Sequence, residues 1–519
     1  MKKKKISRRK FMTILGVTGG VLVAGGVGGA AYIRSRFTSD TTPGPGEDGE
    51  IVTVAEGQLQ GTINDGIYRY LGVPYAEAAE RFVTAGPVTP WEGVLKADSY
   101  GPMSPQGSML GFGAGNQDGT DNNCQNLNIW TPGLNDGGLR PVLVWLHGGG
   151  FSTGTANNSS YDGEALAKNG DVVVVSVNHR LNVFGYLDLS AYDEKYKDSA
   201  NVGMWDIIAA LEWIQQNIEV FGGDPDNVTV FGQSGGGAKV LGLMSTPYAV
   251  GLFHKGIVES GVTETVGVNF TSQEASTRLA ENLLAELNIA PENIEQLQTV
   301  AVDKLQSAAT KALDATAQEF QIPAPLTDGY QMEWEPVVDG DFLPTSPVTE
   351  TNFADAGQDI PLLIGSNLNE WTGFYRTSTD GVDTDALSAA LKTAYPDKTD
   401  LTADHVDTLI RLPILKTMSH KADQNGAPVY SYLLTYGSSN HGAEIPYIFR
   451  HSDVSAMNDL FSSIWVNFAR SGIPSADSLP TWEPYTREGG ATMLLDTTSQ
   501  LVYHHDDALL KLLVPDYEY

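Results

Sequence analysis

Ser234 stands where a reactive hydroxyl could be exposed. It lies in the segment GQSGG at 232–236, directly after the apolar run 228–231. A serine on a sharp turn from a strand to a helix presents its hydroxyl to substrate, and a β-carbon two residues to either side would strike neighbouring backbone. The pattern therefore predicts a nucleophile. The alternative is a glycine-rich connection without a catalytic role.

A second glycine cluster upstream could bind a developing negative charge. The apolar run 141–146 predicts a buried strand, which leads into HGGGF at 147–151. Peptide N–H groups can point at an oxyanion only where side chains leave the approach free, and consecutive glycines provide this. We therefore predict an oxyanion hole here rather than a flexible turn.

A serine nucleophile needs a histidine base and a carboxylate downstream. Of the nine histidines, His441 alone lies in a late loop, at 438–442, between a strand-like segment at 429–436 and a new apolar stretch. That position fits the chain order serine, acid, histidine. Glu370 follows the strand-like run 361–367 and is the predicted acid, although a solvated surface glutamate is the alternative.

The strand-like runs and the helical pattern indicate how these residues are positioned. A chain of 519 residues with 41% hydrophobic content can bury a large single core. Leucines recur at helical spacing within 272–316, which predicts a helical insertion over the site, or a layer that only covers the sheet. The predicted strands are 141–146, 172–177, 228–231, 256–261, 361–367 and 429–436.

From about Val52 to the C-terminus, the chain resembles the type-B carboxylesterases, the bacterial carboxylesterase and para-nitrobenzyl esterase relatives of the cholinesterases. The phrases that carry the resemblance are YLGVPYA at 70–76, LNIWTP at 127–132, HGGGF at 147–151, NHR at 178–180, NVG at 201–203, FGGDP at 221–225 and PVVDG at 336–340.

The resemblance implies an α/β-hydrolase fold, with a central, mostly parallel sheet flanked by helices and with helical cap insertions. It implies a serine carboxylesterase that works through an acyl-enzyme and needs no cofactor or metal. It also implies a buried ion pair between Arg180 and Asp206. The implied site consists of Ser234 as nucleophile, Glu370 as acid, His441 as base, and the N–H groups of Gly149, Gly150 and Gly235 as oxyanion hole. The alternatives are a non-catalytic cholinesterase-like binding or adhesion protein, and a lipase or amidase of the same fold.

Three departures from the family pattern alter these expectations. Gln233 replaces the usual glutamate beside the nucleophile, so we expect no strong preference for choline esters. The segment 122–124 reads Asn-Asn-Cys instead of Glu-Asp-Cys, which removes an acidic partner of Arg81. Cys124 is the only cysteine, and Ser104 stands at the position of its usual partner, so no intrachain disulfide can form.

The N-terminus is a separate region. Residues 1–36 contain SRRKFM at 7–12, which closely matches a twin-arginine export signal, and an uncharged apolar stretch at 11–33 that could be cleaved or could stay as a membrane anchor. We expect export by the Tat translocon to the cell surface, the periplasm or the medium, with 37–50 as a flexible linker and 51–519 as the esterase domain. The net charge of −31 makes nucleic acid an improbable partner and leaves a small-molecule ester as the expected substrate.

Overall fold

The computed structural model describes residues 46–107, 119–265, 268–325, 329–373 and 375–518. The predicted export signal at 1–36 and most of the predicted linker at 37–50 lie outside these residues. Strand β1 (Glu47–Val54) begins before the predicted domain boundary, because Glu47 and Asp48 already pair with the next strand. Residues 47–50 therefore belong to the sheet and not to a linker. Within the described ranges, no helix has the length and apolarity needed to cross a membrane.

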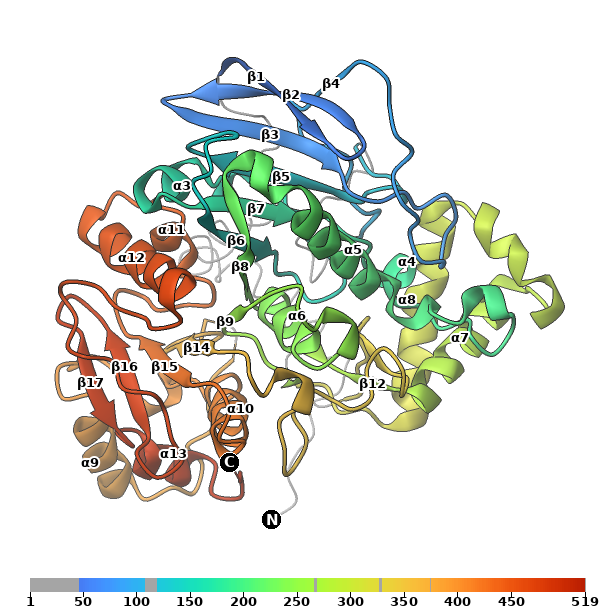
Figure 1. The fold of residues 1–519 in the computed structure, drawn as a ribbon. Coiled ribbons are helices and arrows are strands. Elements are labelled where there is room, and N and C mark those ends of the chain that lie inside the picture. Colours follow the sequence, from blue (N-terminus) through green and yellow to red (C-terminus); the bar gives the residue numbers. More distant parts are fainter. Residues whose placement is uncertain (1–45, 108–118, 266–267, 326–328, 374, 519) are drawn as a thin grey trace, which may run out of the picture.

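A sheet of 13 strands runs through the described part of the chain (Figure 1). Two short strand pairs lie outside it, β10 (Glu264–Thr265) with β11 (Val268–Asn269) and β12 (Thr271–Ser272) with β13 (Val337–Val338). The strands of the large sheet are β1, β2 (Gly57–Asn64), β3 (Ile67–Pro74), β4 (Val94–Lys96), β5 (Asn126–Thr131), β6 (Arg140–Leu146), β7 (Val173–Val177), β8 (Gly223–Gln233), β9 (Lys255–Glu259), β14 (Leu362–Asn367), β15 (Val429–Leu434), β16 (Ala491–Leu495) and β17 (Gln500–Tyr503).

The centre of the sheet is parallel and both its ends are antiparallel. The order is β1-β2-β3-β5-β7-β6-β8-β9-β14-β15-β16-β17, with β4 beside β2, and the strands from β7 to β16 run parallel. The central strands are buried on both faces, which explains why they read as unbroken apolar runs. The predicted mostly parallel sheet is confirmed.

Helices cover both faces of this sheet (Figure 1). The α-helices are α3 (Glu164–Gly170), α4 (Asn182–Tyr186), α5 (Val202–Asn217), α6 (Gly235–Leu243), α7 (Gln273–Leu287), α8 (Val302–Phe320), α9 (Thr384–Ala394), α10 (Arg411–Asp423), α11 (Ile445–Ile448), α12 (Ser455–Ser471) and α13 (Asp507–Leu513). The 3-10 helices are η2 (Ser159–Tyr161), η3 (Glu194–Tyr196), η4 (Ser199–Asn201), η5 (Ile218–Phe221), η6 (Pro247–Ala249), η7 (Pro291–Thr299), η8 (Asp355–Gly357) and η9 (Ala403–His405).

Alternation along each strand divides the buried side chains into two cores. On β6, Val142 and Val144 join the core that contains residues of α5 and α6, whereas Leu143 and Trp145 join the core that contains residues of α3 and α12. Successive side chains of a strand point to opposite faces, so one apolar strand supplies both layers. The sheet is therefore the middle layer of a three-layer structure.

The predicted helical insertion consists of α7, η7 and α8. Helices α7 and α8 pack against each other and lie at one side of the molecule in Figure 1. The four leucines at helical spacing, Leu279, Leu283, Leu284 and Leu287, are all buried. The helical prediction is confirmed, while the role of this pair as a cover over the site stays a prediction.

Arg81 ties this insertion to the rest of the domain without a carboxylate. Its Nη1 donates to the carbonyl oxygens of Val300, at 2.6 Å, and of Leu297, at 3.2 Å, and its guanidinium lies over the ring of Phe184. Two carbonyls and an aromatic face therefore hold Arg81.

The position of the missing disulfide is closed by packing and by hydrogen bonds. Cys124 is a buried free thiol, and burial raises its pKa well above the ordinary value. The hydroxyl of Ser104 accepts a hydrogen bond from the backbone N–H of Leu181 at 3.1 Å. The thiol is therefore protonated and unreactive at neutral pH.

The predicted ion pair between Arg180 and Asp206 is confirmed. Nη2 and Nε of Arg180 donate to the two carboxylate oxygens of Asp206 at 2.7 and 2.9 Å, and both side chains are 0% exposed. The backbone N–H of Arg180 and the amide of Gln125 donate to the same carboxylate. The pair fixes the segment after β7 against α5.

Asp206→Asn should leave the Arg180 guanidinium buried without its counter-charge. We expect the free energy of unfolding to fall by about 3 to 5 kcal/mol, measured by urea denaturation. The control is Lys311→Met, which breaks an exposed ion pair with Glu286 and should cost less than about 1 kcal/mol. Equal losses of unfolding free energy in the two variants would contradict the expectation that the buried ion pair contributes more than the exposed one.

Candidate active site

Ser234 lies on the sharp turn between β8 and α6. Its backbone has φ 58° and ψ −125°, a conformation that costs a non-glycine residue about 1 to 3 kcal/mol. Its N–H donates to the carbonyl of Glu259 on β9 at 2.8 Å. A β-carbon on Gly232 would lie 2.6 Å from the carbonyl oxygen of Leu146, and one on Gly236 would collide with the same oxygen. The predicted tight turn and its need for glycine are confirmed.

Glu370 and His441 lie on two loops that continue a parallel strand pair. Strands β14 and β15 pair in parallel along their whole length. Beyond their ends, the N–H of Asn369 donates to the carbonyl of Ser439 at 3.1 Å, and the N–H of His441 donates to the carbonyl of Glu370 at 3.0 Å. The backbone itself therefore brings the predicted acid and the predicted base together.

The two side chains form a short hydrogen bond. Nδ1 of His441 lies 2.6 Å from Oε2 of Glu370, while the other carboxylate oxygen accepts from the hydroxyl of Ser260 at 2.6 Å and from the N–H of Asn367 at 2.7 Å. The Glu370 side chain is 0% exposed and that of His441 is 12% exposed. A carboxylate can only accept, so Nδ1 carries the proton and Nε2 presents its lone pair.

Nε2 of His441 faces Gln233, the residue that precedes Ser234. The amide nitrogen of Gln233 lies 3.1 Å from Nε2 of His441, and the indole of Trp371 stacks on the imidazole with ring centroids 4.3 Å apart. Among the described residues, no hydrogen bond joins Nε2 to the hydroxyl of Ser234. The imidazole must therefore exchange the Gln233 amide for the serine hydroxyl before it can accept a proton from it.

Three further acidic residues have partners other than His441. Burial and the negative charge of Glu370 raise the pKa of Glu444 to about 7, and this carboxyl accepts from the Asn367 amide at 2.6 Å. Burial raises the pKa of Glu259 well above its ordinary value, and the indole N–H of Trp465 donates to it. Asp339 accepts from Asn201 at 2.8 Å. Glu370 is therefore the carboxylate that orients the imidazole.

The glycine loop and the start of α6 are in close contact. Gly149 and Gly150 have φ values of 96° and 61°, and a β-carbon on Gly235 would lie 2.5 Å from the Cα of Gly150. In the described part of the chain, the N–H groups of Gly149 and Gly150 donate to no protein atom. Gly235 is the first residue of α6, where a helix leaves its N–H groups without an internal acceptor. The structure thus brings the three predicted oxyanion residues together.

Four residues around the site were not predicted. Ser260 and Asn367 bind the acid, Trp371 stacks on the base, and Lys239 on α6 contacts the glycine loop. Ser260 and Asn367 stand at the ends of two predicted strands, and Lys239 is the one charged residue in the segment GGGAKVLGL. These positions in the sequence could have drawn attention to the three residues. The sequence does not show which groups they contact.

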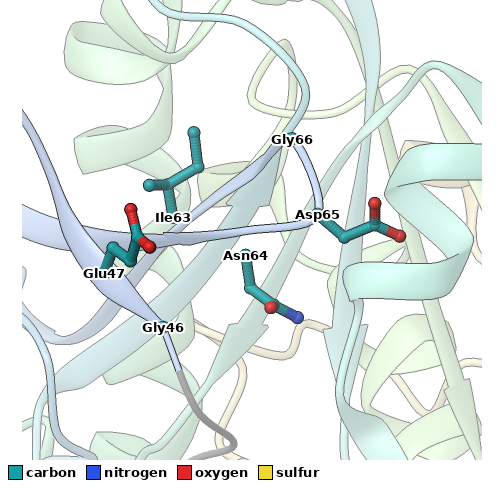
Figure 2. A pocket seen from close by; sticks show the side chains of 6 residues that line it. All are labelled: Gly46, Glu47, Ile63, Asn64, Asp65 and Gly66. Atoms are coloured by element: carbon teal, nitrogen blue, oxygen red, sulfur yellow. The ribbon is translucent and has the colours of Figure 1, made fainter.

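A hollow of about 500 Å³ lies elsewhere (Figure 2). It lies beside the start of β1 and the turn from β2 to β3, and four strands separate β2 from β8 in the sheet order. This hollow is therefore not part of the site around Ser234. Its lining consists of Gly46, Glu47, Ile63, Asn64, Asp65 and Gly66.

The parallel sheet covered on both faces, the serine on the sharp turn and the Glu370–His441 pair define an α/β-hydrolase. Residues 48–405 and 388–509 match the model of the Carboxylesterase family. The chain belongs to this family and is a carboxylic ester hydrolase.

Named relatives and solved structures match this chain over most of its length. The para-nitrobenzyl esterase of Bacillus subtilis (strain 168) is 33% identical over 486 residues, which cover 86% of this chain and 95% of the relative. A solved esterase from the anaerobe Clostridium hathewayi is 33% identical, has a TM-score of 0.79, and is matched over 92% of this chain and 99% of its own. The carboxylesterase of Geobacillus stearothermophilus has a TM-score of 0.72 at 30% identity, over 89% of this chain and 99% of its own.

Glu370→Gln should present the wrong group to His441. Ser260 and Asn367 both donate to one carboxylate oxygen, so the amide oxygen must face them and the NH₂ must face Nδ1. The imidazole then carries its proton on Nε2 and cannot act as a base. We expect kcat for a p-nitrophenyl ester to fall by about 10³- to 10⁴-fold.

The matched control for this change is Asp339→Asn, an acid bonded to Asn201. It should keep kcat within about twofold of the parent enzyme. A nearly silent Glu370→Gln together with an inactive Asp339→Asn or Glu444→Gln would contradict the assignment of Glu370.

Proposed function

We propose that this carboxylesterase hydrolyses esters through an acyl-enzyme formed on Ser234. The observation that carries the proposal is the 2.6 Å hydrogen bond between Glu370 and His441 next to a serine held at a sharp turn. It places a proton on Nδ1, so Nε2 is the nitrogen that acts as general base once it exchanges the Gln233 amide for the serine hydroxyl.

The proposed reaction has two displacement steps. The Ser234 hydroxyl attacks the ester carbonyl carbon while His441 takes its proton, and the N–H groups of Gly149, Gly150 and Gly235 bind the oxyanion. The tetrahedral intermediate collapses, the bond to the alcohol oxygen breaks, and His441 returns the proton to the leaving alcohol. Water then attacks the acyl-serine by the same route and releases the carboxylic acid.

The proposed substrates are neutral esters with short to medium acyl chains. Gln233 carries no charge that would bind a quaternary ammonium, so choline esters should have no advantage over neutral esters of the same size. The relatives are named for varied esters, and the esterase of Clostridium hathewayi can hydrolyse aliphatic aromatic polyesters. Comparing short-chain with long-chain nitrophenyl esters and anilides separates an esterase from a lipase or an amidase.

Ser234→Ala should close the covalent route while keeping the rest of the site. We expect kcat for p-nitrophenyl butyrate to fall by about four orders of magnitude or more, and labelling by a fluorophosphonate to be lost. Ser471→Ala, at the exposed end of α12, is the control and should keep both. A parent enzyme that takes up no label would instead favour the alternative, a non-catalytic binding or adhesion protein.

We also propose export by the twin-arginine route, supported by SRRKFM at 7–12 and the apolar stretch that follows it. Changing Arg8 and Arg9 together to lysine should leave the esterase activity in the cytoplasm, because the translocon reads the arginine pair. Fractionation of cells that express the full chain measures this. Undiminished export of the double variant would contradict the proposal.

A further inference from the structure

Lys239 is a buried cation directly behind the glycine loop. It is the fifth residue of α6 and is 0% exposed. Its Nζ donates to the carbonyl oxygen of Gly150 at 2.7 Å and to that of His147 at 3.2 Å, and it lies 4.8 Å from the ring centroid of Phe151. One side chain therefore contacts the first, the fourth and the fifth residue of HGGGF.

These two hydrogen bonds enclose the peptide groups of the predicted oxyanion hole. The carbonyl of His147 belongs to the peptide before Gly148, and that of Gly150 belongs to the peptide before Phe151. The two peptide groups between them carry the N–H groups of Gly149 and Gly150. The carbonyl of Gly149 accepts from the N–H of Thr153 at 3.1 Å, and the carbonyl of Gly148 lies 2.8 Å from Nδ1 of His147. The peptide groups that carry the two donors are therefore held as well.

Lys239 brings a positive charge to this place. In the described residues, no carboxylate forms an ion pair with it, and burial lowers its pKa to about 7. The ionisable groups that face it are His147 and His179, whose rings stack 5.0 Å apart. Burial lowers the pKa of His147 to about 3 and that of His179 well below its ordinary value. Both histidines are therefore neutral, and the local cation is Lys239.

Burying an ammonium without a carboxylate partner has a high desolvation penalty. An amide could donate hydrogen bonds to the same two carbonyls without a charge. The positive charge can stabilise negative charge that develops next to the loop during the reaction. We propose that Lys239 is a positioning residue of the oxyanion hole, which clamps both ends of the glycine loop and whose charge favours the tetrahedral intermediate. This inference rests on the proposed function of Ser234.

The test compares Lys239→Met and Lys239→Gln with the parent enzyme. Methionine removes charge and donors, whereas glutamine removes the charge and keeps two N–H donors. We expect kcat for p-nitrophenyl butyrate to fall about 10- to 100-fold in Lys239→Met, with KM changed by less than about threefold, because the loop acts on the transition state. Lys239→Arg, which keeps the charge, should recover part of the loss.

Lys421 provides a matched control. It is also 0% exposed, and its Nζ donates to the carbonyls of Gln358 and Ala427. These residues precede β14 and β15, so Lys421 lies at the opposite edge of the sheet from the site. Lys421→Met should lower the melting temperature but leave kcat within about twofold of the parent.

The pH dependence of kcat distinguishes an effect of the Lys239 charge from an effect of its packing. The Lys239 ammonium loses its proton as pH rises through about 7, so its effect on catalysis should be complete at pH 6 and mostly gone at pH 9. The ratio of kcat between parent and Lys239→Met should therefore fall at least about fivefold from pH 6 to pH 9. Titration of Glu444 cancels in this ratio because both enzymes contain it.

Failure of the proposed function and failure of the proposal for Lys239 give different results. Fluorophosphonate labelling counts functional Ser234 in every variant, so a parent that takes up no label defeats the proposed function itself. If all variants are labelled fully, a pH-independent ratio, or a Lys239→Met kcat within about twofold of the parent, overturns the role of Lys239 alone. If Lys239→Met does not fold, the same ratio measured with Lys239→Gln decides.

Discussion

The parallel pairing of β14 with β15 determines where the acid and the base of the site meet. Its register continues into the loops, where backbone hydrogen bonds join Asn369 to Ser439 and Glu370 to His441. The 2.6 Å contact between the Glu370 and His441 side chains then requires little side-chain ordering beyond what the sheet already imposes. Ser260, at the end of β9, binds the same carboxylate, so three adjacent strands support one acid.

The site concentrates groups that are costly to bury. Ser234 has a strained backbone, and Glu259, Glu444 and Lys239 are fully buried ionisable side chains. Burial raises the pKa of the two glutamates and lowers that of the lysine, so each shift favours the neutral form. Perturbed groups of this kind gather where a protein performs chemistry, since a stable core alone would not retain them.

The three residues affected by departures from the family pattern form hydrogen bonds with neutral groups in this structure. Arg81 binds carbonyls next to η7 where the resemblance implies a carboxylate, and Ser104 accepts an N–H where the resemblance implies a cysteine. Gln233, in place of glutamate, donates to the base. Hydrogen bonds with neutral groups therefore stand at three positions where the resemblance implies a charge or a covalent bond.

The sequence by itself determined the fold class, through its resemblance to a known family. It also determined the central strands, the glycines of the turn at Ser234 and the candidates Glu370 and His441. The strands, the turn and the two candidates rest on local signals, because strand burial and a tight turn limit which residues can stand at each position. Only the tertiary structure decided that Gln233 contacts Nε2 of His441, that Ser260 and Asn367 bind the acid, and that Lys239 clamps the glycine loop. In these contacts a side chain meets a group on another element, and Lys239 and His147 are 92 residues apart. No local pattern encodes such a pairing, because it arises only when the parallel strands align their carboxyl ends.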